Sequence, residues 1–138
     1  MEATFRQFFD GYVGVWKSSS LMELKDLISK DYKAREVTDG RIMDFGYEES
    51  LKGWEQGFNF VKENGASWEI TEIAEMPLRD GETMMIISAA IILNDKRMET
   101  SNLFMQTFKM DDNNDWKLVR SYIETSIPMA KMDSMQFN

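Results

Sequence analysis

The amino-acid sequence predicts an α+β domain in which three N-terminal helices precede one curved, mainly antiparallel sheet. Apolar residues recur at helical spacing as far as Gly65, whereas long β-prone runs separated by short polar turns fill the remainder. With 138 residues and no internal repeat or linker, the chain fits a single domain over residues 1–138. Residues 129–138 are predicted to form a tail that either frays or docks on a neighbour.

The first helix is predicted from about Glu2 to Lys17, because apolar side chains including Tyr12 and Trp16 recur on one face. A short second helix follows, with Ser20 and Glu23 in the S-x-x-E pattern of a capping box.

A third helix is predicted over Glu48–Glu63, with Trp54 and Phe58 on one face and Gly65 as its stop. A short strand over Tyr32–Val37 and a turn over Thr38–Arg41 precede it. Four long strands with short turns, typical of an antiparallel meander, are predicted over Ser67–Leu78, Thr83–Leu93, Met98–Met110 and Trp116–Ile127.

Composition excludes several classes of chemistry. The chain has 24 acidic against 16 basic residues, a net charge of −8, and no run of Lys and Arg, so no nucleic-acid partner is expected. It contains no Cys and no His, which excludes thiolate and imidazole catalysis and metal sites built from them. Acid–base chemistry would come from Asp, Glu, Tyr or Lys, and no metal or other cofactor is expected.

No membrane partner is expected either. The N-terminal residues lack the basic start and apolar core of a signal peptide. The longest apolar run, Met84–Leu93, is too short to cross a bilayer as a helix. These features favour a cytoplasmic protein.

The element order, the Tyr12–Trp16 end of the first helix and the closing run Trp116–Val119 resemble the nuclear transport factor 2-like superfamily over Phe5–Pro128. Within it, the chain looks most like the SnoaL-like and ketosteroid isomerase-like subgroup. The closing run also looks like the last strand of the association domain of calcium/calmodulin-dependent protein kinase II. The resemblance implies a cone-shaped α+β barrel whose sheet wraps round the helices, a pocket at the wide end, and a homodimer formed through the sheet.

Aligned with a ketosteroid isomerase, Tyr12 falls on the oxyanion-stabilising tyrosine, Glu36 on the general-base aspartate, and Gln106 where the family keeps a protonated aspartate. The resemblance therefore implies two hydrogen-bond donors and a carboxylate base. The residue pattern leaves alternatives open. Tyr12 is otherwise a core aromatic, Gln106 a paired core amide, and Glu36 a solvated carboxylate flanked by Lys33 and Arg35.

Further pocket-lining residues are predicted from the faces of the helices and strands: Trp16, Trp54, Phe58, Asn102, Phe108, Ser121 and Ile123. Strict alternation divides the last strand into two sets of side chains, and the resemblance implies that one of them lies on the concave face: Lys117, Val119, Ser121, Ile123 and Thr125. The other set would lie on the convex face and reach the dimer interface through Leu118 and Tyr122. The reverse assignment would turn Arg120, Tyr122 and Glu124 into the pocket.

Three functions remain open. The favoured one is a domain that binds a small molecule of unknown identity in the cone, with catalysis unproven. An isomerase or cyclase acting on a polycyclic or carbonyl compound is the second, and a non-catalytic dimeric protein-interaction domain is the third. The absence of His, the Gln in place of the second acid and the cations beside Glu36 argue against the enzyme.

Overall fold

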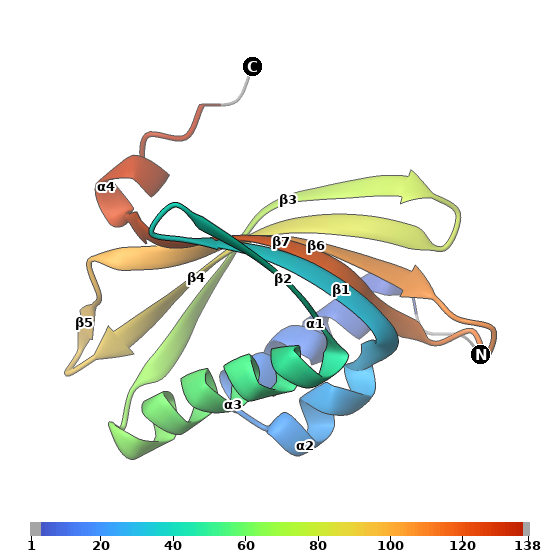
Figure 1. Cartoon of the computed structure of the whole chain (residues 1–138), viewed down its shortest axis with the longest axis horizontal. Helices are drawn as coiled ribbons and strands as arrows, with labels where there is room; N and C mark the ends of the chain where they lie inside the picture. Colours follow the sequence, from blue (N-terminus) through green and yellow to red (C-terminus); the bar gives the residue numbers. More distant parts are fainter. Residues whose placement is uncertain (1–3, 137–138) are drawn as a thin grey trace.

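The helices that precede residue 64 lie on one side of a strongly curled, unclosed sheet in the computed structural model, which describes residues 4–136, and a last short helix lies apart from them at the end of the final strand (Figure 1). The helices are α1 (Phe5–Lys17), α2 (Leu21–Leu24), the 3-10 helix η1 (Lys25–Leu27), α3 (Tyr47–Glu63) and α4 (Met129–Met132). The strands are β1 (Ile28–Thr38), β2 (Arg41–Gly46), β3 (Ser67–Arg79), β4 (Glu82–Leu93), β5 (Lys96–Arg97), β6 (Thr100–Met110) and β7 (Trp116–Pro128). The predicted α+β class is confirmed.

Local capping fixes the first two helices. Thr4 is the N-cap of α1: its side chain accepts from Gln7 N at 3.1 Å, and the Gln7 side chain accepts from Thr4 N at 3.0 Å. The predicted start at Glu2 lies outside the described residues. Ser20 caps α2 as predicted, accepting from Glu23 N at 3.3 Å.

The strands pair in the order β2-β1-β7-β6-β4-β3, and β5 pairs with β4. All of these pairs are antiparallel except β1 with β7, which is parallel. The strand β2 was not predicted, because four of its six residues are exposed and give no apolar alternation. The predicted turn before it is confirmed.

Aromatic side chains of α1 and β6 form the centre of the core under the concave face. Phe9, Tyr12 and Trp16 are at most 1% exposed. The ring of Phe108 on β6 lies 5.7 Å from that of Phe9 and 5.0 Å from that of Tyr12, both edge-on. Three turns of α1 are therefore fixed against one strand.

A β-bulge in β7 corrects the predicted faces of the last strand. Leu118 lies opposite Phe108 on β6, but the next pair joins Arg120 to Thr107, so Val119 is an extra residue. The bulge shifts the alternation by one residue, and the inward side chains are Trp116, Leu118, Ser121 and Ile123. Both strictly alternating sets were therefore wrong.

Two consequences of the bulge concern the predicted sites. Leu118 is 0% exposed and belongs to the core, so its predicted place at a dimer interface was wrong. The reverse assignment is also excluded, because Tyr122 faces outward at 38% exposure and its hydroxyl donates to Glu124 Oε2 at 2.5 Å.

Of the described helices, none has the length and apolar character needed to cross a membrane.

Candidate functional site

Strand register arranges the inward-facing side chains in rows that run from one end of the cone to the other. The first row joins Leu118 to Phe108, the second Ser121 to Gln106, and the third Ile123 to Phe104. Phe108 is 0% and Gln106 1% exposed, whereas Phe104 is 8% exposed. Asn102, one step further along β6, is half-buried. The cone is therefore sealed at the Phe108 end and opens towards Asn102.

The second row holds the predicted pair of donors. Tyr12 Oη donates to Gln106 Oε1 at 2.9 Å, and both side chains are buried. Burial raises the pKa of Tyr12 well above its ordinary value, so the phenol stays protonated. The structure thus brings Tyr12 and Gln106 together, but as partners of each other, which matches the paired-core alternative for both residues. Their roles towards a ligand remain a prediction.

We expect Tyr12→Phe to lower the free energy of unfolding by about 1–3 kcal/mol, because it leaves Gln106 Oε1 buried without its donor. Urea denaturation would measure the change. Adding Gln106→Leu to Tyr12→Phe should recover part of the loss, because both polar partners are then replaced by apolar ones. A single variant as stable as the native protein would show that the bond contributes nothing.

Glu36, the predicted base, lies on β1 in the third row. It is half-buried, its Cα pairs with that of Ile123, and it follows the buried Tyr32 and Ala34 on the same strand face. The pKa of Tyr32 is raised to about 12, mainly by burial of its hydroxyl and to a lesser extent by the nearby charge of Glu36. Arg35 does not pair with Glu36, because it bonds Asp44 at 2.7 Å on the opposite face. Neither of the two flanking cations, Lys33 and Arg35, therefore forms an ion pair with Glu36 in the described part of the chain.

Polar side chains close the outer rim beside Glu36. Thr125 Oγ1 donates to Val37 O at 3.0 Å and lies 3.0 Å from Thr38 Oγ1, which lies 3.4 Å from Glu36 Oε2. Asn102, a predicted pocket residue, uses its Oδ1 to accept from the backbone N of Ser126 at 2.9 Å. It thereby fixes a second irregularity of β7, where Ser126 has φ of 55°.

An aromatic wall of Trp16, Trp54 and Phe104 stands over the third row. Trp16 lies edge-on to Trp54 at 4.8 Å and to Phe104 at 5.2 Å, and Trp54 is stacked parallel to Phe104 at 6.4 Å. Trp54 is half-buried, and the predicted pocket residue Phe58 is packed behind it at 5.6 Å. Phe108, by contrast, lies at the sealed end.

Two buried polar atoms near this wall lack a partner. Among residues 4–136, Trp16 Nε1 has no acceptor, and Ser121 Oγ makes no hydrogen bond of good geometry, although it lies near enough to the Tyr32 hydroxyl to act on the pKa of that group. A third such atom, Trp116 Nε1, is at the sealed end, where its ring contacts that of Phe5 at 5.1 Å. By contrast, Trp68 Nε1 donates to Ser19 Oγ at 2.9 Å.

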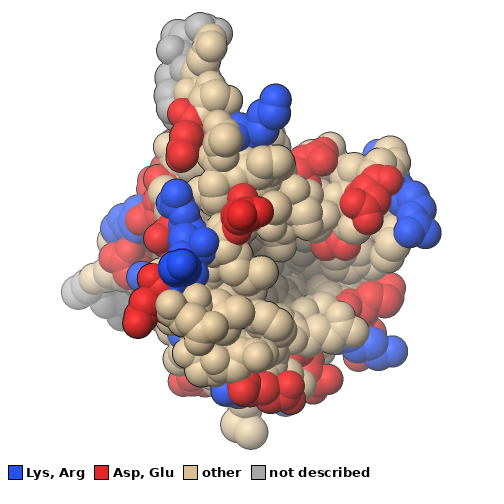
Figure 2. Space-filling view, turned by 90° about the vertical axis from the view of Figure 1, so that its left-hand side faces the viewer, with Lys and Arg blue, Asp and Glu red and all other residues tan. Residues whose placement is uncertain are grey.

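Figure 2 views the open end, where the β1–β2 turn, the β4–β5 turn and α4 gather in Figure 1. The surface is hollowed there, and uncharged residues surround the hollow together with acidic residues at several points. We call Glu36, Trp16, Trp54, Phe104 and Ile123 the wide-end site. Phe104 was not among the predicted site residues, although two-residue alternation from Gln106 marks it. No group of three or more Asp and Glu in the described part of the chain is arranged to hold a metal.

Comparison with known proteins gives similarity in three-dimensional structure but not in sequence. No family model matches the chain, and no curated protein matches it. A structure described as a calcium/calmodulin-dependent protein kinase type II association domain, from Thiobacillus denitrificans, has a TM-score of 0.67 at 12% identity, covering 92% of this chain and 98% of that one.

Two further structures are similar to this chain in the same way. A nuclear transport factor 2-like protein of unknown function from Shewanella oneidensis has a TM-score of 0.65 at 13% identity and covers 87% of this chain and 95% of its own. An uncharacterised protein with a cystatin-like fold from Caulobacter vibrioides has a TM-score of 0.64 at 12% identity, with 94% and 92% covered. The narrower resemblance to SnoaL-like proteins stays a prediction. The chain therefore has the cystatin-like fold of nuclear transport factor 2-like proteins.

Proposed function

We propose that this protein binds a flat, mainly apolar small molecule in the wide-end site. The observation that carries the proposal is Trp16 Nε1–H, a buried donor without an acceptor among residues 4–136. An unpaired buried donor costs about 1–3 kcal/mol. An acceptor on a bound molecule would offset that cost, and the molecular surface is hollowed at this end of the cone (Figure 2).

The chemistry around the site narrows the class of ligand. The rings of Trp16, Trp54 and Phe104 present flat apolar surface, which favours a ligand of one or two fused rings. Glu36 at the rim favours a donor or a positive charge on the part of the ligand that faces outward. With a net charge of −8, the protein disfavours an anionic ligand here.

Titration with 2-naphthol, a flat apolar compound with one hydroxyl group, tests the site by calorimetry. We expect saturable binding by the native protein, weakened about 3–10-fold in Trp54→Leu through loss of the stacking ring. Trp116→Phe is the matched control at the sealed end and should bind like the native protein. Equal loss of affinity in both variants, or no binding by a set of such compounds, would contradict the proposal.

Isomerase or cyclase chemistry by Tyr12, Glu36 and Gln106 is less well supported. It needs a phenol free to donate to the substrate oxygen. Here the Tyr12 hydroxyl donates to Gln106 instead, and both lie in the sealed part of the cone. A cytoplasmic location also remains a proposal, supported by the absence of Cys, and cell fractionation would test it.

We further propose a homodimer through the convex face of the sheet. The support is the uncovered apolar surface on that face, since α1, α2 and α3 all lie against the other side (Figure 1). Ile42, Met76, Met105 and Tyr122 are 36–63% exposed, Met105 pairs with Tyr122, and the cross-strand partners Val37, Met84 and Ile86 continue the same face. Such a two-sided sheet is stabilised when both faces are covered.

Met105→Glu should convert this dimer to a monomer, because it places a charge at the middle of an interface of about 1,600 Å², the standard size. Sedimentation equilibrium of native and variant protein would measure the masses. Lys52→Gln, on the exposed face of α3, controls for a change of one charge unit. A native protein that sediments as a monomer would remove the proposal.

A further inference from the structure

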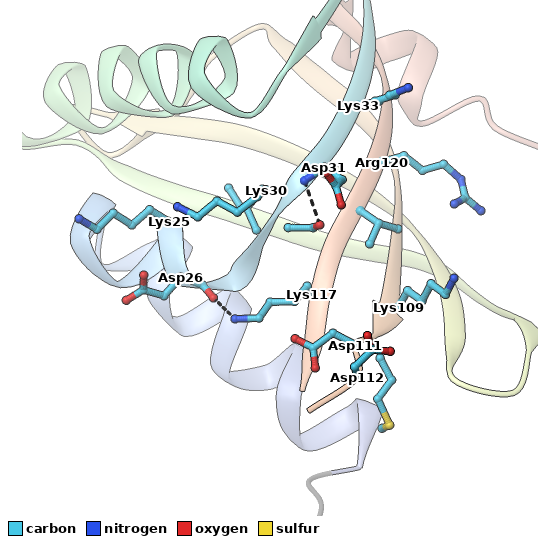
Figure 3. A pocket seen from close by; sticks show the side chains of 14 residues that line it. Lys25, Asp26, Lys30, Asp31, Lys33, Lys109, Asp111, Asp112, Lys117 and Arg120 are labelled. Atoms are coloured by element: carbon cyan, nitrogen blue, oxygen red, sulfur yellow. Dashed lines mark hydrogen bonds between the residues drawn. The ribbon is translucent and has the colours of Figure 1, made fainter. Parts of the chain in front are cut away.

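A second cleft lies at the opposite end of the molecule from the wide-end site, between the start of β1, the start of β7 and the β6–β7 turn (Figure 3). Its volume is about 830 Å³. None of the wide-end residues lines it. Its basic lining residues come from four elements: Lys25, Lys30, Lys33, Lys109, Lys117 and Arg120.

The pairing of β1 with β7 explains why the cleft opens. Ile28 pairs with Leu118, but the next pair joins Lys33 to Arg120, so β1 advances five residues while β7 advances two. The surplus residues of β1 arch away from β7 and interrupt the ladder. The arch separates the side chains of Lys25 and Lys30 on one side of the cleft from those of Lys109 and Arg120 on the other (Figure 3).

Positive charge gathers in this cleft although the protein is acidic. Six of the 16 basic residues line it, together with four aspartates, in a chain of net charge −8. Within residues 4–136, none of the five cleft lysines has a carboxylate oxygen within 4.0 Å. Elsewhere Arg6, Arg35 and Arg97 all pair with carboxylates. Lys117 donates to the backbone oxygen of Asp26, and Lys30 lies over the ring of Tyr47 and donates to its hydroxyl. Lys25, Lys33 and Lys109 have no such partner among residues 4–136 and are available to a ligand.

Two pairs of like charges face each other across the strands that form the cleft. Lys109 pairs directly with Lys117 between β6 and β7, and Lys33 pairs with Arg120 between β1 and β7. Like charges directly opposite on one face destabilise a sheet. Of these four residues, Arg120 pairs with Glu82 Oε2 at 2.7 Å and Lys117 donates to the backbone oxygen of Asp26, whereas Lys33 and Lys109 have no carboxylate partner in the described part of the chain. An anion between these strands would remove the repulsion.

The aspartates of the cleft limit the shape of that anion. The Asp111 carboxylate already accepts hydrogen bonds from the backbone N of Asn113 at 2.9 Å and of Asp115 at 3.0 Å, so it stabilises the β6–β7 turn. Asp111 and Asp112 stand together at one edge (Figure 3). Carboxylates at the edge repel a long polyanion that runs past it, but they leave room for a compact one between the lysines.

We infer that the cleft between β1 and β7 binds a compact anion with three or more negative charges, of the polyphosphate or polycarboxylate class. The lining has no aromatic side chain for a nucleobase to stack on, so the charged group itself is recognised. Lys33 on β1 and Lys109 on β6 supply the contacts from the two strands that flank β7, and each donates without losing a carboxylate partner.

Calorimetric titration with tripolyphosphate, and separately with citrate, tests the inference in low salt without divalent cations. We expect saturable binding of at least one of the two, and the stronger one identifies phosphate or carboxylate as the preferred group. Lys33→Gln and Lys109→Gln should each weaken it about tenfold, and 0.3 M salt should weaken it further.

Lys52→Gln and Lys62→Gln, on the exposed face of α3, are the matched controls and should bind like the native protein. Because Lys33 and Lys109 are exposed, their variants should fold, and circular dichroism with thermal denaturation would verify this. Absence of binding for both anions, or equal weakening by the α3 variants, would overturn the inference.

Discussion

Trp16→Ala should lower the free energy of unfolding by about 3–5 kcal/mol, the usual cost of deleting a buried aromatic side chain. Trp16 is 1% exposed and meets four rings, those of Tyr12, Trp54, Trp68 and Phe104, at centroid distances from 4.8 to 6.1 Å. It therefore joins α1 to α3, β3 and β6 at once. The cavity left behind could not be filled by a small movement of any single neighbour.

Urea denaturation followed by far-ultraviolet circular dichroism would measure the loss. The control is Trp54→Ala, which should cost less, about 2–3 kcal/mol, because Trp54 is only half-buried. A larger loss at Trp54 than at Trp16 would mean that α3, rather than α1, carries the centre of the core.

Leu118→Ala should cost about 2–5 kcal/mol, whereas Val119→Ala should cost about 1 kcal/mol or less. Leu118 is 0% exposed and lies opposite Phe108, while Val119 is the half-buried extra residue of the bulge. A strand of strict alternation, with Val119 on the same face as Ser121 and Ile123, would give the opposite order.

The test is which of the two variants loses more free energy of unfolding. Equilibrium unfolding in urea gives both free energies, and equal slopes against urea concentration would show that the unfolded states are comparable. A loss at Val119 that exceeds the loss at Leu118 would show that β7 continues without the bulge.

Periodicity predicted the elements but not their irregularities. The α1 and α3 faces followed from apolar spacing, and the helix starts at Thr4 and Ser20 are fixed by side-chain caps. The bulge at Val119 has no such signal, because the residues around it are neither Gly nor Pro. One extra residue moved Leu118 from a predicted interface into the core.

The candidate site could be predicted only in part for similar reasons. The resemblance to ketosteroid isomerases placed Tyr12 and Gln106 on facing elements, and they do meet. No sequence pattern predicts that these two side chains form a hydrogen bond with each other, because the bond depends on the distance between α1 and β6. The unpaired Trp16 Nε1 is likewise a property of the packing.

The basic cleft was missed because its residues are distant in the chain. The sequence contains no run of Lys and Arg, and on that ground no nucleic-acid partner was expected. Lys33 and Lys109 are brought near β7 from opposite sides only by the parallel β1–β7 pairing and the β6–β7 hairpin. Long-range strand order cannot be read from local spacing.

The most direct test of the wide-end site is the NMR signal of the Trp16 Nε1–H group in ¹⁵N-labelled protein during titration with 2-naphthol. If the site binds such a molecule, the Trp16 signal should shift downfield as its donor gains an acceptor, the Trp54 signal should move with it, and the Trp116 signal at the sealed end should stay in place. A titration that moves the Trp116 signal alone, or leaves the Trp16 and Trp54 signals unchanged at saturation, would contradict binding at the wide end.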